Sequence, residues 1–105
     1  MEEYIQVLTT TETKEDAKKI AKELVERRLA ACIQISGPIT SVFRWDENIQ
    51  EESEWRITIK TGYDLYEDLE KVLEGIHPYE VPEIVALPLI RGSEKYFEWM
   101  KNELD

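Results

Sequence analysis

The chain has 105 residues, enough for one domain with one hydrophobic core. Hydrophobic residues make up 42% of it, which argues against disorder, and the formal net charge of −10 repels phosphate backbones and anionic lipid. We therefore expect a single domain over residues 1–105 that binds neither nucleic acid nor membranes.

The sequence favours a cytoplasmic location. Cys32 is the single cysteine, so no intrachain disulfide can form, which fits a reducing compartment. Met1-Glu2-Glu3-Tyr4 lacks the basic region and apolar stretch of a signal peptide, and no apolar run approaches the roughly 20 residues that span a bilayer. The charged fraction of 34%, mostly Glu and Lys, would suit a thermophilic source.

The first third of the chain predicts a strand and then a helix. Tyr4–Thr9 is β-prone, and Thr13 with Asp16 three residues later is typical of a capping box. Apolar residues follow at helical spacing and predict an amphipathic helix over Thr13–Arg28. They are Ala17, Ile20, Ala21, Leu24, Val25 and Leu29.

A long β-hairpin comes next. Ala31–Trp45 alternates with a period of two, interrupted at Gly37-Pro38, where we expect a bulge or bend. Asp46-Glu47-Asn48 predicts the turn. The return strand, Ile49–Lys60, is expected to keep the same parity. One side of the outer arms would then carry Phe43, Trp45, Ile49 and Trp55.

The last third predicts a helix, a strand and a second, short helix. Gly62 and Asp64 open the first helix, which ends near Gly75 because glycine commonly terminates helices. A stiff loop follows, then a strand whose proline suggests an edge position or a bulge, a turn and a capped C-terminal helix. The loop is His77–Glu83, the strand is Ile84–Ile90 with Pro88, and the turn is Arg91-Gly92-Ser93. The apolar residues of the C-terminal helix are Tyr96, Phe97, Trp99, Met100 and Leu104.

This order predicts an α+β, ferredoxin-like βαββαβ sandwich with a long β-hairpin and an extra C-terminal helix. Two helices should cover one sheet face and leave the other open. Hairpin arms of fifteen residues would span about 50 Å, against about 20 Å for the flanking strands. Because the outer half would expose apolar side chains and strand edges, we expect self-association. The alternative is that the arms fold back under the C-terminal helix.

Several segments together resemble the CutA divalent-cation tolerance proteins over essentially the full length. They are Leu29–Ile33, Ile39–Trp45, Trp55–Thr61, Tyr96–Trp99 and above all His77-Pro78-Tyr79-Glu80-Val81-Pro82-Glu83-Ile84. The resemblance implies a compact homotrimer in which hairpin arms interlock, with an architecture similar to PII signalling proteins. It implies a part in tolerance to copper and other divalent ions, and it supplies no molecular activity, so we expect no enzyme.

The resemblance also implies a metal site, which this sequence carries only in part. Family members place a cysteine at the end of the first strand and two histidines before Pro-Tyr, where this chain has Thr9, Ile76 and His77. One imidazole cannot hold Cu²⁺ specifically, because such sites use three or four N or S ligands. His77 and the carboxylate of Glu80 remain candidate ligands for a divalent metal. The alternative is a structural histidine that donates a hydrogen bond within a rigid loop.

A second constellation follows from the resemblance. Lys60, Tyr79, Glu83 and Trp45 would line a cleft between subunits, with the charges and aromatic rings usual in a small-molecule site. The alternative is an interface ion pair between Lys60 and Glu83. Cys32 has the parity of the sheet face turned away from the helices, where it is either a small hydrophobic residue or a ligand.

Two functions remain open, a metal-binding tolerance trimer and a PII-like regulator that binds a small anionic or nucleotide ligand. An RNA-recognition domain shares the element order but needs a basic face. An acylphosphatase-like enzyme needs an arginine in the loop after the first strand, which here reads Thr10-Thr11-Glu12-Thr13. Phosphate-loop, dinucleotide, CxxC and GxSxG motifs are absent from the sequence.

Overall fold

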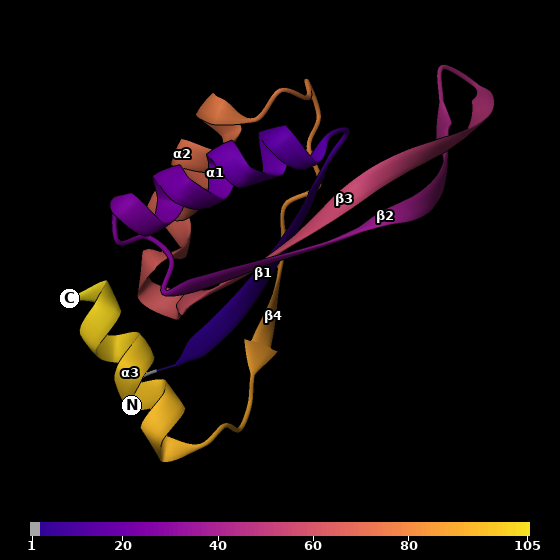
Figure 1. The fold of residues 1–105 in the computed structure, drawn as a ribbon. Coiled ribbons are helices and arrows are strands. Elements are labelled where there is room, and N and C mark those ends of the chain that lie inside the picture. Colours follow the sequence, from indigo (N-terminus) through magenta and orange to yellow (C-terminus); the bar gives the residue numbers. More distant parts are fainter. Residues whose placement is uncertain (1–2) are drawn as a thin grey trace.

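The fold is a four-stranded antiparallel sheet with two helices on one face, and Figure 1 shows it in a computed structural model that describes residues 3–105. The sheet order is β2-β3-β1-β4. The elements are β1 (Tyr4–Thr11), α1 (Lys14–Glu26), β2 (Cys32–Trp45), β3 (Asn48–Gly62), a 3₁₀ turn (Tyr63–Leu65), α2 (Tyr66–Ile76), β4 (Val85–Leu89) and α3 (Glu94–Leu104). The predicted ferredoxin-like α+β class is confirmed.

The core lies between the sheet and the layer of α1 and α2. The apolar stripe of α1 meets Ile57 and Ile59 of β3, both fully buried, as the period-two pattern predicted. Leu69 and Leu73 of α2 are equally buried. The other members of this cluster are Ile5, Val7, Ala17, Ile20, Leu24 and Ala30.

Helix α1 begins where the sequence predicted and ends two residues earlier. The Thr13 side chain accepts a hydrogen bond from the Asp16 N–H at 3.1 Å, which confirms the cap. At the other end Arg28 adopts a left-handed φ of 57°. Its N–H donates to the Val25 carbonyl and the Leu29 N–H to the Leu24 carbonyl, both at 3.0 Å, which is the Schellman pattern. The helix therefore ends two residues before the approximate end predicted at Arg28, because the chain reverses there without a glycine.

Helix α2 begins later than predicted and ends close to its glycine. Gly62 leads into the 3₁₀ turn, and α2 starts only at Tyr66. Gly75 lies inside the last turn, and His77 is the residue that caps the helix. The helix thus ends near Gly75, as predicted, one residue beyond the glycine.

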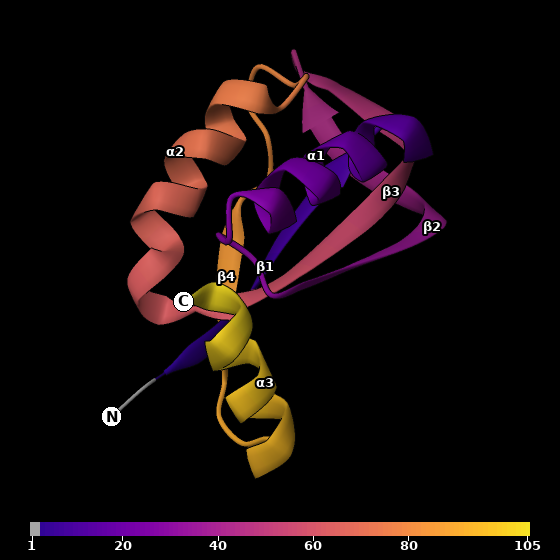
Figure 2. The same ribbon diagram turned by 60° about the vertical axis from the view of Figure 1, so that its left-hand side comes forward.

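The C-terminal half closes one end of the sheet. Pro88 lies on edge strand β4, opposite Ile5, as its missing N–H predicted. Ser93 caps α3 by accepting from the Tyr96 N–H at 3.2 Å. Figure 2 shows α3 beside the sheet end where β1 begins, and Phe97 of α3 stacks on Tyr4 at 4.7 Å. The sheet face opposite α1 and α2 is thus partly covered, whereas the sequence predicted it fully open.

The hairpin of β2 and β3 extends far beyond the rest of the molecule (Figure 1). With the hairpin included, the molecule measures 45 × 25 × 22 Å along its principal axes. Its turn is at Asp46 and Glu47, as predicted, and both residues have positive φ values of 49° and 66°. Figure 1 shows the tip at the end of the molecule remote from α3, so the alternative in which α3 covers the arms does not describe this chain.

The pairing register changes along the hairpin, and this corrects the predicted faces. Cys32 pairs with Lys60, but beyond the irregularity between Ser36 and Ile39 the sum of paired residue numbers rises by one, and Phe43 pairs with Gln50. Partners across a pair share a sheet face. Ile49, the partner of Arg44, therefore lies on the face opposite Phe43 and Trp45, and the expectation of one common apolar side was wrong.

Both faces of the hairpin tip consequently expose apolar side chains. Phe43 and Trp45 lie on one face, and Val42 and Ile49 on the other, and all four are exposed.

No helix in the described part of the chain is long and apolar enough to cross a membrane.

Candidate functional site

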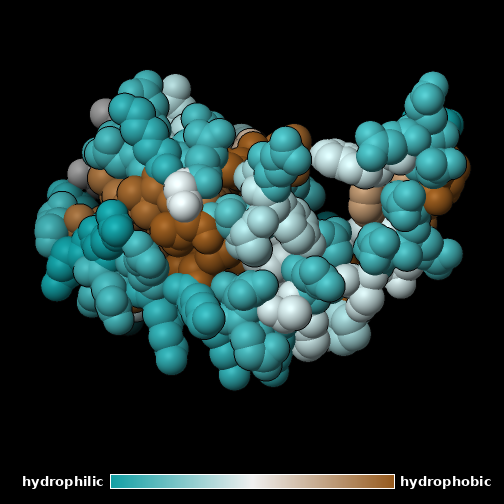
Figure 3. All heavy atoms as spheres, turned by 90° about the horizontal axis from the view of Figure 1, so that it is seen from above, coloured by the Kyte–Doolittle hydropathy of each residue, from teal (hydrophilic) through white to brown (hydrophobic). Residues whose placement is uncertain are grey.

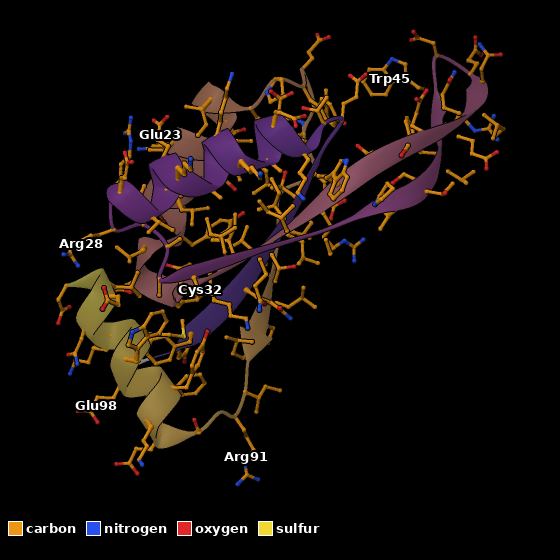
Figure 4. The ribbon with its side chains drawn as sticks, viewed as in Figure 1. Glu23, Arg28, Cys32, Trp45, Arg91 and Glu98 are labelled. Atoms are coloured by element: carbon orange, nitrogen blue, oxygen red, sulfur yellow. The ribbon has the colours of Figure 1, made fainter. Side chains whose placement is uncertain are left out.

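A cleft of about 900 Å³ lies between the outer hairpin and the loop from His77 to Glu83. Figure 3 shows the open space between the body of the molecule and the hairpin end. In Figure 4 the ring of Trp45 points from the tip back toward the body, over this space. The residues that line the cleft are Thr10, Glu12, Ser41, Val42, Phe43, Trp45, Gln50, Glu52, Ser53, Glu54, Tyr79, Glu80, Val81 and Glu83.

His77 fixes the loop that forms one wall of this cleft. Its Nε2 lies 2.8 Å from the carbonyl oxygen of Thr10 and 3.1 Å from the hydroxyl of Thr9. Its Nδ1 accepts the Tyr79 N–H at 3.0 Å. The side chain is 8% exposed, and burial is the main reason why its pKa lies below the ordinary value, against the opposing effects of the Thr10 carbonyl, Asp16 and Glu54. The ring is therefore held neutral between β1 and the loop.

Tyr79 connects the same loop to the hairpin on the other side of the cleft. Its hydroxyl donates a 2.7 Å hydrogen bond to Glu54 Oε2 on β3, and Glu54 is 9% exposed. Burial raises the pKa of the Glu54 carboxyl, but hydrogen bonds from Tyr79, Ser41 and Thr10 and the nearby His77 outweigh it and bring the pKa below 4.5. Burial and the bond to Glu54 raise the pKa of Tyr79. At neutral pH the pair is thus a neutral phenol on a charged carboxylate.

The cleft is strongly acidic. Five glutamates line it. Among residues 3–105, which the structure describes, no Lys, Arg or His belongs to the lining. Like charges gathered around one concavity add their fields there and attract counter-ions. This electrostatic environment favours cations and opposes the phosphates of a nucleotide.

The structure brings together most, but not all, of the residues predicted for the cleft. Trp45, Tyr79, Glu80 and Glu83 line it. Lys60 does not, because it lies opposite Cys32 near the other end of β3, with its Nζ 5.6 Å from the centre of the Tyr96 ring. An ion pair between Lys60 and Glu83 within one chain is accordingly not formed.

Cys32 lies on the predicted sheet face, away from α1 and α2, and α3 partly covers it. Figure 4 labels it at the α3 end of β2, remote from Trp45. Burial and the adjacent Cys32 raise the pKa of Tyr96, to which the thiol is hydrogen-bonded. This contact gives Cys32 a packing role against α3.

The residues of one chain do not fit a transition metal. The part of the chain that the structure describes contains no group of three His, Cys, Asp or Glu side chains placed to hold a metal ion. Both nitrogens of His77 are engaged in hydrogen bonds, and Thr9 presents a hydroxyl to the ring. Sites for Cu²⁺ or Zn²⁺ need three or four N or S donors, so further donors would have to come from another chain.

Sequence reasoning missed Glu54 and Glu52. Both stand at even positions of β3, which the alternating pattern assigned to the solvent. The signal that could have found Glu54 is that this acid comes directly before the stretch that leads to the buried Ile57 and Ile59, where a carboxylate needs a hydrogen-bond donor.

Comparison with known proteins supports the family resemblance. The family model for the CutA1 divalent ion tolerance protein matches residues 5–103. The chain is 43% identical over 98 residues to protein CutA, chloroplastic, of Arabidopsis thaliana, covering 93% of this chain and 54% of that relative. It is 43% identical over 96 residues to the divalent-cation tolerance protein CutA of Thermus thermophilus, covering 91% of this chain and 93% of the relative. It thus spans about half the length of the plant relative and nearly all of the bacterial one.

Solved structures show the same fold. The CutA1 divalent ion tolerance protein of Ehrlichia chaffeensis matches with a TM-score of 0.95 and 33% identity, covering 100% of this chain and 98% of the other. The periplasmic divalent cation tolerance protein CutA of Archaeoglobus fulgidus matches with a TM-score of 0.94 and 30% identity, covering 97% and 99%.

Proposed function

The chain belongs to the CutA1 divalent ion tolerance protein family, and from that premise we propose that it acts in cation tolerance as a cytoplasmic homotrimer. In this proposal the hairpin of each subunit is covered by its neighbours. The acidic cleft between hairpin and loop then binds a cation at the boundary between subunits.

The observation that carries the proposal is the apolar surface on both faces of the hairpin tip. Fully burying a large apolar side chain is worth roughly 1.5–3 kcal/mol, and four such side chains are exposed on the tip. A neighbour that covered one face would leave the other in water. A closed ring of subunits can cover both faces of every hairpin, because each subunit then packs its own hairpin against its neighbours and covers a hairpin of theirs.

The cation proposal rests on the charge of the cleft. Glu80 and Glu83 come from the loop, and Glu52 and Glu54 from the hairpin. Because one chain does not supply a complete metal site, a divalent ion such as Cu²⁺ would need donors from a second subunit, and Lys60 could reach the cleft only from that subunit as well.

The test of assembly is the mass in solution. Sedimentation equilibrium should give three times the chain mass of 12.4 kDa. Ile49→Glu, at a side chain that is 63% exposed, should dissociate the trimer, because it places a charge on a face that a neighbour covers. Tyr63→Glu is the matched control, since Tyr63 is 64% exposed but lies outside the hairpin, and it should leave the mass unchanged. A monomeric wild type would end the proposal.

A second candidate is a PII-like regulator that binds a small organic ligand in the same cleft. The volume and the rings of Phe43, Trp45 and Tyr79 favour it, although the surrounding carboxylates select a cationic ligand over an anionic one. Calorimetric titration of the trimer with Cu²⁺, with Glu83→Gln as the comparison, separates the two. Heat that Glu83→Gln abolishes supports the metal, and no heat with any divalent ion leaves the organic ligand.

A further inference from the structure

His77 is the single histidine of the chain, and it is the residue that the family resemblance offers first as a metal ligand. We propose instead that His77 is a positioning residue, which ties the Tyr79–Glu83 loop to the end of β1 and does not coordinate the cation. The inference rests on the proposed function, since it assigns the role of one residue beside that same cleft.

The hydrogen bonds determine which ring nitrogen carries the proton. The Thr10 carbonyl oxygen, 2.8 Å from Nε2, can only accept, so Nε2 must be the N–H. The Tyr79 backbone N–H, 3.0 Å from Nδ1, can only donate, so Nδ1 must offer its lone pair. His77 is thereby held as the neutral Nε2–H tautomer with both nitrogens occupied.

A metal ion would have to break this arrangement. Coordination requires a free lone pair, but the lone pair of Nδ1 binds Tyr79 and Nε2 is protonated. The ring is 8% exposed and does not belong to the lining of the cleft. Displacing either bond would take a hydrogen-bond partner from the Thr10 carbonyl or from the Tyr79 N–H.

The same bonds explain what the residue does for the site. His77 connects the end of β1 to the loop, and two residues later the Tyr79 hydroxyl reaches Glu54 on β3. The loop that carries Glu80 and Glu83 is thus held on one side by His77 and on the other by Tyr79. In this way the His77 ring sets the position of these carboxylates relative to the hairpin without contacting the cation.

Nuclear magnetic resonance on the ¹⁵N-labelled full chain tests the tautomer directly. With one histidine, the long-range ¹H–¹⁵N correlation of the imidazole contains a single ring. We expect the pattern of the Nε2–H tautomer, unchanged after one equivalent of diamagnetic Zn²⁺. An Nδ1–H pattern, or ring nitrogen shifts that move with Zn²⁺, would overturn the proposal.

Two variants separate positioning from ligation. In His77→Gln the side-chain amide N–H can still donate to the Thr10 carbonyl and so keep the contact with β1, whereas His77→Ala loses the hydrogen bonds of both ring nitrogens. We expect the Glu54 carboxyl, followed by its ¹³C signal, to keep its depressed pKa in His77→Gln and to lose part of the depression in His77→Ala. If the Glu54 pKa were the same in wild type and both variants, His77 would not position the loop.

Cation affinity, measured by calorimetry, is the third readout. We expect His77→Gln to remain within about threefold of wild type and His77→Ala to bind more weakly. Loss of binding in both variants alike would identify His77 as a ligand. If the wild type itself binds no divalent ion, the cation part of the proposed function fails, while the tautomer and the Glu54 pKa still decide the role of His77.

Discussion

The bond between Tyr79 and Glu54 is the most direct target for a quantitative test. Tyr79→Phe removes only the hydroxyl that donates to Glu54 Oε2 at 2.7 Å and keeps the ring in place. Hydrogen bonds to charged groups contribute about 1.5–3 kcal/mol, and because Tyr79 is only half-buried we expect the lower end, a loss of about 1.5 kcal/mol in the free energy of unfolding at pH 7.

The pH dependence of this loss has a definite sign. The folded pKa of Glu54 is below 4.5, so the carboxylate contributes stability above the unfolded pKa and loses it as the pH falls through the folded value. The difference between wild type and Tyr79→Phe should therefore be constant from pH 7 to about pH 5 and should shrink below about pH 4.

Urea denaturation at one fixed chain concentration is the assay, because an oligomer changes its apparent stability with concentration. Glu54→Gln provides the control background, since an amide oxygen still accepts the bond but carries no charge. Neutral hydrogen bonds are about half as strong, so Tyr79→Phe should cost about 0.8 kcal/mol there. Equal losses in both backgrounds, or equal losses at pH 3.5 and pH 7, would refute the charge-assisted bond.

Three substitutions that add or remove a glycine test the local backbone conformation and packing, with the free energy of unfolding measured by thermal or urea denaturation. Gly75→Ala should raise the free energy of unfolding by about 0.5–1 kcal/mol, because a Cβ there meets nothing within 4 Å and Gly75 lies inside α2. Gly92→Ala should lower it by about 1–3 kcal/mol, because its Cβ would lie 2.5 Å from the Phe97 ring, which stacks on Tyr4. Glu47→Gly should raise it by about 1 kcal/mol, because Glu47 has a left-handed φ of 66°. A change of the opposite sign at any of the three would contradict the conformation assigned to that residue.

Local signals in the sequence predicted most of the elements correctly. Thr13 and Ser93 were predictable as helix caps, because each hydroxyl accepts a hydrogen bond from the N–H only three residues later and an apolar stripe at helical spacing follows. Pro88 identified an edge strand because its missing N–H is incompatible with a strand paired on both sides. Arg28 gave no such signal, since a left-handed helix end is usually marked by glycine.

The register of the hairpin could not be extrapolated past its irregularity. Gly37-Pro38 indicated a bulge, but one extra residue in β2 shifts every later cross-strand partner and leaves the alternation along β3 itself unchanged. Counting parity on each strand therefore looked consistent while it assigned Ile49 to the wrong face. The correction matters for function, since it distributes the apolar surface of the tip over both faces.

The site was predictable where residues are close in sequence and unpredictable where they are not. The segment from His77 to Glu83 stood out as a motif, and its internal bond from Tyr79 to His77 spans two residues. The partner of Tyr79 is Glu54, 25 residues away, and the partner of His77 is Thr10, 67 residues away. No periodicity connects such pairs, because only the packing of the loop against two strands brings them together.

The two unusual features of the hairpin end can be considered together under the proposed assembly. An isolated chain would place five carboxylates around a cleft and four apolar side chains in water beside them, and each arrangement opposes folding of a lone subunit. A neighbour that covers the tip buries the apolar side chains but also lowers the dielectric around the glutamates, which strengthens their repulsion. Assembly therefore makes a counter-charge in the cleft more favourable, so subunit association and cation binding should reinforce each other in a single coupled equilibrium.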